Sequence, residues 1–322
     1  MRRVILTMGL TLLLSATSCQ AQRQARAGEL ARNAVILEIK SVQQSLGFEP
    51  TENFLEHSSE TPAVYRCYYT GKLELPESYE KLRFHEGSRD GCAIDESKYD
   101  VFFYPIEAVA SGKAAVTESL SQASAERLAV VVSHEDFHNQ EALKKLPETM
   151  HEAAATLVGF LTAAEYVRQK SGPDSEQHQG LAREAELYLR KAGIVNAYHT
   201  RVSQLYTKAQ NGAVPEKEAL AEKAKLFEEL GKECSAIDPS PATFNRCPAV
   251  LNNAALAFDR TYTKDYALMH RLYLAHKRDL KATIKTLASF SQQDNLSDRG
   301  AEEKLLEIVG RLEAGIPLGR MP

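Results

Sequence analysis

The chain carries, at residues 129–138, the stretch Ala129-Val130-Val131-Val132-Ser133-His134-Glu135-Asp136-Phe137-His138. It is strongly apolar up to Val132 and then becomes polar, which is typical of a buried helix whose last turn faces a cleft. His134 and His138 are four positions apart, so on a helix they project from one face about one turn apart. That spacing lets two imidazoles bind one metal ion, with Glu135 beside the first of them. The pattern H-E-x-x-H is the signature of zinc hydrolases.

A catalytic zinc needs a third protein ligand and keeps one position open. Glu152 follows His138 by fourteen positions, inside a run of small residues at 150–160 that comes after Pro147. Small residues allow two helices to approach closely, and the proline indicates the turn between them. Two helices folded back on one another would bring Glu152 to the two histidines. The residues therefore predict a Zn²⁺ site made by His134, His138 and Glu152.

The chemistry of such a site assigns further roles. Zinc lowers the pKa of bound water to about 7, and Glu135 is placed to take the proton of that water as a general base. Thr156, one turn beyond Glu152, is the candidate that orients a metal ligand through a hydrogen bond. The competing interpretation is a solvated helix face on which two histidines lie four apart by chance, because short motifs produce false positives.

The composition is that of an ordinary globular protein. The 322 residues are 43% hydrophobic and 25% charged, and the formal net charge is −4. This length allows one large domain or two smaller ones. The chain has no basic surplus, so nucleic acid is not an expected partner.

The N-terminus has the pattern of an export signal. Two arginines precede the apolar run Val4–Leu14, and small residues then lead to Cys19. The run is shorter than the roughly 20 apolar residues of a spanning helix, so we expect a signal peptide at 1–18. A Cys in this place resembles a bacterial lipobox, although Ala16 replaces the usual Leu. We therefore expect lipidation of Cys19, and Gln20 after it indicates sorting to the outer membrane, facing the periplasm. The alternative is a soluble secreted protein in which Cys19 is incidental.

The remaining cysteines are even in number. They are Cys67, Cys92, Cys234 and Cys247. In an exported chain an even count indicates two disulfides, for which three pairings exist. Proximity in sequence favours Cys67 with Cys92 and Cys234 with Cys247. A zinc site made from all four thiolates is disfavoured, because no C-x-x-C spacing occurs and the compartment is oxidising.

The first third of the chain mixes several patterns. Residues 19–34 are polar and are expected to form a tether that leads into a helix near 31–46. The segment 51–105 contains the convincing strand signals, at 63–69 and 101–104, separated by loop residues. We expect a small β-containing segment here.

From residue 106 to residue 322 the periodicity is helical. Helices are expected near 114–141, 148–170, 174–192, 195–210, 215–232, 249–259, 263–291 (with a break) and 299–313. Glycines and prolines mark the breaks, including one at Gly193. No linker separates the mixed segment from the helices. We therefore predict one mainly α, multi-helix domain over 35–322, with the β-containing segment near its N-terminus.

Three stretches match motifs of a known family. His134-Glu135-Asp136-Phe137-His138-Asn139 resembles its H-E-x-x-H-Q segment, and His151-Glu152-Ala153-Ala154-Ala155-Thr156 is similar to its N-E-S-F-A-T segment. Leu251-Asn252-Asn253-Ala254-Ala255-Leu256, followed by Thr261-Tyr262, matches a downstream N-N-A-x-L and T-Y pair. The chain thus resembles the predicted zinc aminopeptidases of bacteria, of the gluzincin type. The motifs occur in the same order over most of the mature chain.

The resemblance implies an α+β fold like that of the gluzincins and additional site residues. It supports Glu152 as the third ligand and draws attention to Asn252, Asn253 and Tyr262. The two amides would bond to the substrate backbone, and the Tyr262 hydroxyl would stabilise the tetrahedral oxyanion. The alternatives are helix capping for the asparagines and a core position for the tyrosine. The chain departs from the family at His151, where the family has Asn.

Taken together, these patterns predict a zinc-dependent peptide hydrolase of the aminopeptidase type, anchored in the cell envelope by its N-terminal lipid. The substrate would be a peptide. No segment that would bind the free amine of a substrate is recognisable, so the choice between exopeptidase and endopeptidase stays open. The alternative is a non-catalytic helical envelope lipoprotein that binds a protein partner, with a structural or vestigial metal site. The sequence does not identify such a partner.

Overall fold

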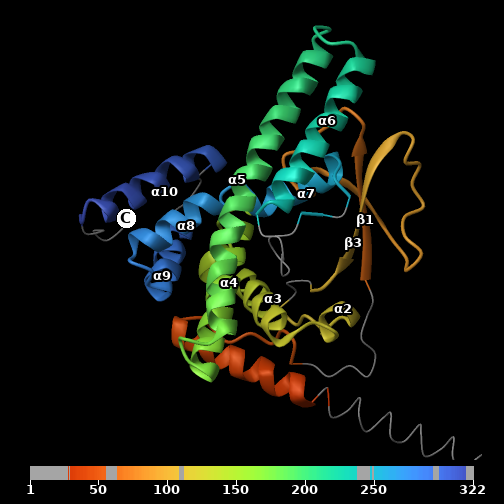
Figure 1. The fold of residues 1–322 in the computed structure, drawn as a ribbon. Coiled ribbons are helices and arrows are strands. Elements are labelled where there is room, and N and C mark those ends of the chain that lie inside the picture. The colour runs from red at the N-terminus through yellow and green to blue at the C-terminus, as the bar shows by residue number, and fades with distance from the viewer. Residues whose placement is uncertain are drawn as a thin grey trace, which may run out of the picture.

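The computed structural model describes residues 28, 30–55, 64–108, 112–237, 247–248, 250–292 and 297–316. Helices make up most of this part, and a small antiparallel sheet lies at their side (Figure 1). The prediction of a mainly α fold with a small β segment near the N-terminus is confirmed. The expected signal peptide at 1–18 and the lipidation site Cys19 lie outside the described residues. Within the described ranges, no helix combines the length and the apolar character that a membrane span requires.

The helices begin and end close to the expected positions. The described part contains a helix over residues 30–46, α2 (Glu118–Ser121), α3 (Ala125–His138), α4 (Glu148–Ser171), α5 (Glu176–Gln210), α6 (Glu216–Ser235), α7 (Asn253–Thr263), α8 (Tyr266–Ala275), α9 (Leu280–Ser291) and α10 (Asp298–Glu313). Two short 3₁₀ helices, η1 (Tyr79–Lys81) and η2 (Glu141–Leu143), lie between them.

Two expected helix boundaries were wrong. The break at Gly193 does not occur, because α5 runs through it without interruption. A glycine costs a helix about 1 kcal/mol relative to alanine, and burial of the nearby Ala192 and Val195 outweighs that cost. The helix expected over 114–141 is instead divided into α2 and α3, because the hydroxyl of Ser124 caps the start of α3 by accepting a hydrogen bond from the Arg127 amide.

Within the described residues, three strands form the sheet in the order β2-β1-β3, all antiparallel. They are β1 (Val64–Gly71), β2 (Arg83–Glu86) and β3 (Tyr99–Ile106). The strands β1 and β3 were expected, whereas β2 was not, since its four residues are all exposed and show no alternation. Disulfides join Cys67 to Cys92 and Cys234 to Cys247, as the sequence proximity predicted.

The helices α3 and α4 pack against each other at the centre of the molecule. Small residues of α4 permit this, as expected. Ala153, Ala154 and Ala155 are fully buried. A methyl group added to Gly159 would lie only 3.0 Å from the Val130 carbonyl oxygen of α3. The two helices therefore approach so closely that their facing side chains share one site.

The helix α7 lies between the sheet and the other helices, since it contacts β1, β3 and η1 on one side and α4 and α5 on the other. Phe258 fills this junction, with ring centroids 5.3 Å from Tyr68, 5.0 Å from Phe102 and 4.8 Å from Tyr104. Figure 1 shows α5 running past this region, with α8, α9 and α10 on its other side in that view. One cavity therefore lies between these elements, namely the sheet, η1, α3, α4 and α7.

Candidate metal centre

Three potential ligand atoms converge between α3 and α4. The Nε2 atoms of His134 and His138 are 3.0 Å apart, and each lies 3.2 Å from Oε2 of Glu152. Ligand atoms at the corners of a tetrahedron, with bonds of about 2 Å to zinc, lie about 3.3 Å apart. Within the described part of the chain, this is the group of side chains that could hold a metal ion.

The position of α3 is fixed by polar contacts made from within the motif itself. Asp136 is fully buried and accepts hydrogen bonds from the Lys40 ammonium at 2.8 Å, from the Thr51 hydroxyl, and from the Asn53 amide at 2.9 Å. Asn53 also donates to Asn139, just beyond the motif, at 2.6 Å. The motif residues that do not face Glu152 therefore anchor the helix to residues 40–53.

Tyr79, in η1, orients the third candidate ligand. Its hydroxyl donates to Oε1 of Glu152 at 3.2 Å, while Oε2 of the same carboxylate faces the two histidines. Burial opposes the charge of Glu152, but His138 and His134 outweigh it and hold the pKa of the carboxyl below its usual range. Burial, followed by the charge of Glu152, raises the pKa of Tyr79, so its hydroxyl stays protonated and able to donate.

Sequence reasoning missed Tyr79. It lies 73 positions before Glu152, and no spacing or motif links the two. The backbone amide of Tyr79 donates to the Thr261 hydroxyl at 2.8 Å, which ties η1 to α7. Only the packing of η1 against α7 brings this tyrosine to the site.

Glu135 lies in the wall of the same cavity as the three ligand candidates. Burial raises the pKa of its carboxyl to about 7, and the negative charge of Glu152 adds to this effect, while His138 opposes it. A carboxyl with a pKa near 7 can both accept and release a proton at neutral pH. The position of Glu135 in the cavity wall permits the acid–base role that the motif predicted.

The cavity has a volume of about 710 Å³ and is formed by the sheet, η1, α3, α4, α5 and α7. Tyr262 lines it, with a ring centroid 6.1 Å from that of His134. Burial, followed by the charge of Glu152, raises the pKa of Tyr262 well above its usual value. Tyr262 thus remains a hydrogen-bond donor beside the metal-ligand group. The large cavity provides room for part of a peptide.

Two further residues of α4 line the cavity. Thr156 is buried one turn after Glu152, but the hydrogen bonds of the described residues do not join it to a ligand side chain, and Tyr79 makes that contact instead. His151 packs against His138 with ring centroids 4.5 Å apart. Burial, followed by the neighbouring His138, lowers the pKa of His151 to about 3, so its ring is neutral at pH 7.

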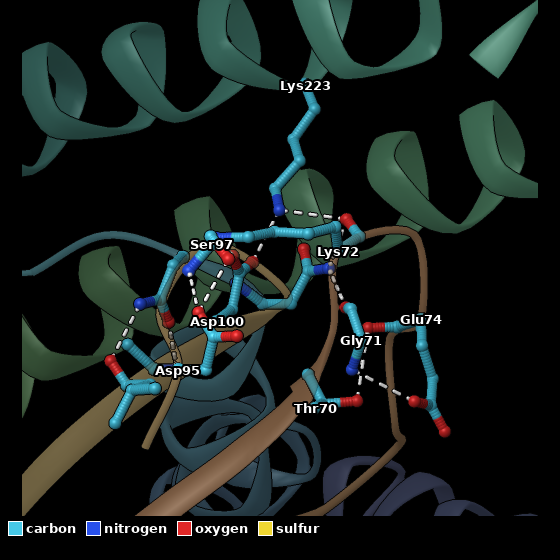
Figure 2. Close-up of polar contacts among 12 residues, drawn as sticks. Thr70, Gly71, Lys72, Glu74, Asp95, Ser97, Asp100 and Lys223 are labelled. Carbon is cyan, nitrogen blue, oxygen red and sulfur yellow. Dashed lines mark hydrogen bonds and ion pairs between the residues drawn. The ribbon is translucent and has the colours of Figure 1, made fainter. Parts of the chain in front are cut away.

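Asn252 and Asn253 do not reach this cavity. Asn252 caps α7 by accepting from the Ala255 amide at 3.0 Å, and its side chain donates to the Val101 carbonyl at 2.8 Å. Asn253 is fully buried, and its backbone amide donates to Asp100 at 3.0 Å. Figure 2 shows Asp100 with Lys223 and Lys72. Its side chain donates to the carbonyls of residues 71 and 72 and accepts from Tyr206. Both amides are committed to protein groups, so their position gives no support to a substrate-binding role.

Comparison with known proteins assigns the chain to a family. A family model described as "Putative aminopeptidase" matches residues 111–302, which include the H-E-x-x-H motif, Glu152 and Tyr262. The chain belongs to this family, since the match covers more than half of its length. Family membership supports a peptidase-like function and implies a peptide substrate. No match was found among curated proteins or among solved structures.

Proposed function

We propose that this protein is a zinc-dependent aminopeptidase. The observation that carries the proposal is the triangle of ligand atoms from His134, His138 and Glu152, with sides of 3.0 and 3.2 Å, in the wall of a cavity that also contains Glu135. Two imidazole nitrogens and one carboxylate oxygen are the ligand set of many catalytic zinc sites, which leave a fourth position open. The donor set therefore fits zinc.

The side chains of the cavity have separate roles in hydrolysis. Zinc, when bound, supplies a Lewis acid that activates water and polarises the peptide carbonyl. Glu135 accepts a proton from the attacking water and delivers it to the leaving amine, a role that its place in the cavity wall beside His134 suits. Tyr262 donates a hydrogen bond to the oxygen that becomes negative. Tyr79 holds Glu152 in place through its hydroxyl.

The cellular location of the protein is proposed from the sequence alone. The signal pattern at 1–18 and the Cys that follows it favour a lipoprotein of the outer membrane, held by its lipid and facing the periplasm. The two disulfides are consistent with an oxidising compartment. The single domain predicted over 35–322 would then stand on the tether at 19–34.

The test combines metal content with peptide hydrolysis. We expect about one zinc per chain, lost in His134→Ala and Glu152→Ala because each removes a ligand. We expect Glu135→Gln to keep its zinc and to lower kcat by roughly 10²- to 10⁴-fold, the usual contribution of a general base. Glu307→Gln, an exposed substitution on α10, serves as the matched control and should behave as the wild type.

A non-catalytic envelope protein would give a different result. If the zinc-loaded protein cleaves no member of a broad peptide library, the enzymatic proposal fails and a vestigial metal site is favoured. If zinc does not bind, or binds equally to His134→Ala, the proposed metal centre fails as well.

A further inference from the structure

A buried ion pair in the cavity wall has no role in the chemistry described above. Asp259, on α7, and Lys191, on α5, both line the cavity, and Oδ2 of Asp259 lies 3.1 Å from the Lys191 ammonium. The two side chains are 13% and 5% exposed, whereas Glu80, elsewhere in the same wall, is exposed. The cavity therefore has a buried polar end whose two charges neutralise each other.

Two buried hydroxyls in the same wall lack a partner within the protein. Tyr188, on α5, is 5% exposed and Thr156, on α4, is 6% exposed, and both residues line the cavity. Among the described residues, no hydrogen bond is made by either hydroxyl. Buried polar groups in proteins are nearly always hydrogen-bonded. The partner of these hydroxyls must therefore come from what the cavity contains.

The Tyr188 hydroxyl belongs to the same polar end as the ion pair. Lys191 follows Tyr188 by three positions on α5, and its ammonium lies 5.4 Å from the centroid of the Tyr188 ring. Burial, followed by the charge of Asp259, raises the pKa of Tyr188 well above its usual value, so the hydroxyl stays protonated. Tyr188 can thus donate a hydrogen bond to a bound group, and the Asp259 carboxylate can accept one from it.

Aromatic rings form the cavity wall between this polar end and the metal-ligand group. Phe258 directly precedes Asp259 on α7, and its ring centroid lies 4.8 Å from that of Tyr104 and 5.5 Å from that of Tyr262. Tyr262 follows Asp259 by three positions, so their Cβ atoms share a helix face about 5–6 Å apart. The Tyr262 ring centroid is 6.1 Å from that of His134. The polar end therefore lies about one helical turn from the metal-ligand group.

The chemistry of this pocket selects one kind of side chain. Its aromatic walls favour an aromatic ring, which packs against them face to edge or offset. A charged tip is disfavoured, because the charges of Lys191 and Asp259 already neutralise each other and a further buried charge would be unpaired. A phenol hydroxyl both donates and accepts, whereas an indole N–H only donates and a phenylalanine ring does neither. Tyrosine matches the walls and both polar partners.

We propose that Asp259 and Tyr188 bind the phenol hydroxyl of a substrate tyrosine, so that the protein cleaves preferentially after tyrosine residues. This inference rests on the proposed function and specifies the substrate side chain next to the broken bond. The phenol hydroxyl donates to Asp259 and accepts from Tyr188. Lys191 holds Asp259 in place through the ion pair, and Phe258 and Tyr104 contact the substrate ring.

The first test is kinetic. Zinc-loaded wild-type protein should cleave tyrosine p-nitroanilide with a kcat/KM about 10- to 100-fold above that for phenylalanine p-nitroanilide, the contribution of one hydrogen bond to a charged group. Tyr188→Phe removes a neutral hydrogen bond and should lower this preference by about 2- to 10-fold. The loss should appear mainly in KM for the tyrosine substrate.

Two further variants complete the kinetic test. Tyr198→Phe is the matched control, because it removes a hydroxyl of the same helix that bonds to Glu233 and does not line the cavity. It should keep the wild-type preference. Asp259→Asn should lower the preference more than Tyr188→Phe does. Because Asp259→Asn leaves the Lys191 ammonium buried without a counter-charge, a melting curve shows whether that variant folds, and Tyr188→Phe decides the question if it does not.

The second test does not need catalysis. Metal-free protein should bind tyrosinamide more tightly than phenylalaninamide in a calorimetric titration. Tyr188→Phe should narrow the difference between the two dissociation constants by about 2- to 10-fold, as in the kinetic test. Tyr198→Phe should leave it as in the wild type.

The outcomes separate this inference from the proposed function. If the zinc-loaded protein hydrolyses neither the anilides nor any library peptide, the proposed function fails, and the titration alone then decides whether the pocket binds a phenol. Equal values for the tyrosine and phenylalanine compounds would overturn the inference. A preference for a charged side chain would overturn it as well, and so would a tyrosine preference that is the same in Tyr188→Phe and the wild type.

Discussion

Two buried carboxylates of this protein have opposite surroundings. Asp100, at 4% exposure, accepts hydrogen bonds from the ammonium groups of Lys223 and Lys72 (Figure 2) and from the backbone amide of Asn253. Glu152, at 8% exposure, faces the Nε2 atoms of His134 and His138, which could bind a metal ion. The first cluster is complete, because its donors and acceptors match. The second places the carboxylate beside two imidazole nitrogens, an arrangement that is completed either by protons on those nitrogens or by a cation.

This difference shows how a structural cluster can be told from a functional one. Burying a charge is costly unless partners compensate for it, and structural clusters contain those partners. The Asp100 cluster joins β1, β3, α6 and the start of α7, so it fixes α7 between the sheet and the helices. At Glu152 the compensation within the chain comes from the Tyr79 hydroxyl and from His138 and His134, and the two imidazoles provide it only where Nε2 carries a proton. A bound cation would take the place of those protons, and this dependence supports the proposal of a metal site.

The largest effect on stability is expected at the complete cluster. Asp100→Ala would leave the ammonium of Lys223 buried without a counter-charge, which typically costs about 3–5 kcal/mol. Urea denaturation of the metal-free protein measures this loss. The double variant Asp100→Ala with Lys223→Met should recover part of it, because the buried positive charge is also removed.

Glu152→Gln is the matched substitution at the incomplete cluster. In metal-free protein it should change the free energy of unfolding by less than about 1 kcal/mol, because the amide still accepts from Tyr79 and no buried cation loses its partner. Stabilisation by added zinc should disappear in the same variant. Similar losses for Asp100→Ala and Glu152→Gln would contradict the distinction between the two clusters.

A smaller effect is expected from Tyr79→Phe, which removes the hydrogen bond to Glu152. Partners of this kind usually contribute 10- to 100-fold to metal affinity. Competition with a chelator of known affinity measures the change. Tyr206→Phe is the control, because it removes a hydrogen bond to Asn253 in the Asp100 cluster. The control should lower stability and leave zinc affinity unchanged. Equal zinc affinities for the wild type and Tyr79→Phe would remove Tyr79 from the site.

The smallest effect concerns pH and lies outside both clusters. His199 is buried beside the Pro76 carbonyl, and this burial lowers its pKa below the usual value of about 6.5. The unfolded chain therefore binds a proton more readily, and stability from this residue is lost as the pH falls below about 6.5. The slope is at most about 1.4 kcal/mol per pH unit. His199→Gln should unfold with a weaker pH dependence between pH 7 and pH 5, as followed by urea denaturation at several pH values. An unchanged dependence would show that His199 does not titrate on unfolding.

Local patterns were the part of this protein that the sequence predicted well. The i,i+4 spacing of His134 and His138 places both rings on one helix face wherever the helix lies. Each disulfide joins two cysteines that follow one another in the order of the cysteines along the chain. The small residues of α4 correctly indicated a close helix pair. Predictions failed where packing overrides local preference, as in α5, which continues through Gly193 because Ala192 and Val195 nearby are buried.

The sequence by itself thus determined the helical class, the helix pair and the two histidines that face Glu152, because each depends on contacts within one or two turns or between adjacent elements. The tertiary structure alone decided which residues surround that group. Tyr79 and Glu80 reach the cavity through the packing of η1 against α7, and Asn253 is directed instead into the Asp100 cluster. These contacts join residues separated by about 70 positions or more. No periodicity of the sequence predicts a contact between residues so far apart along the chain, so only the folded structure shows these contacts.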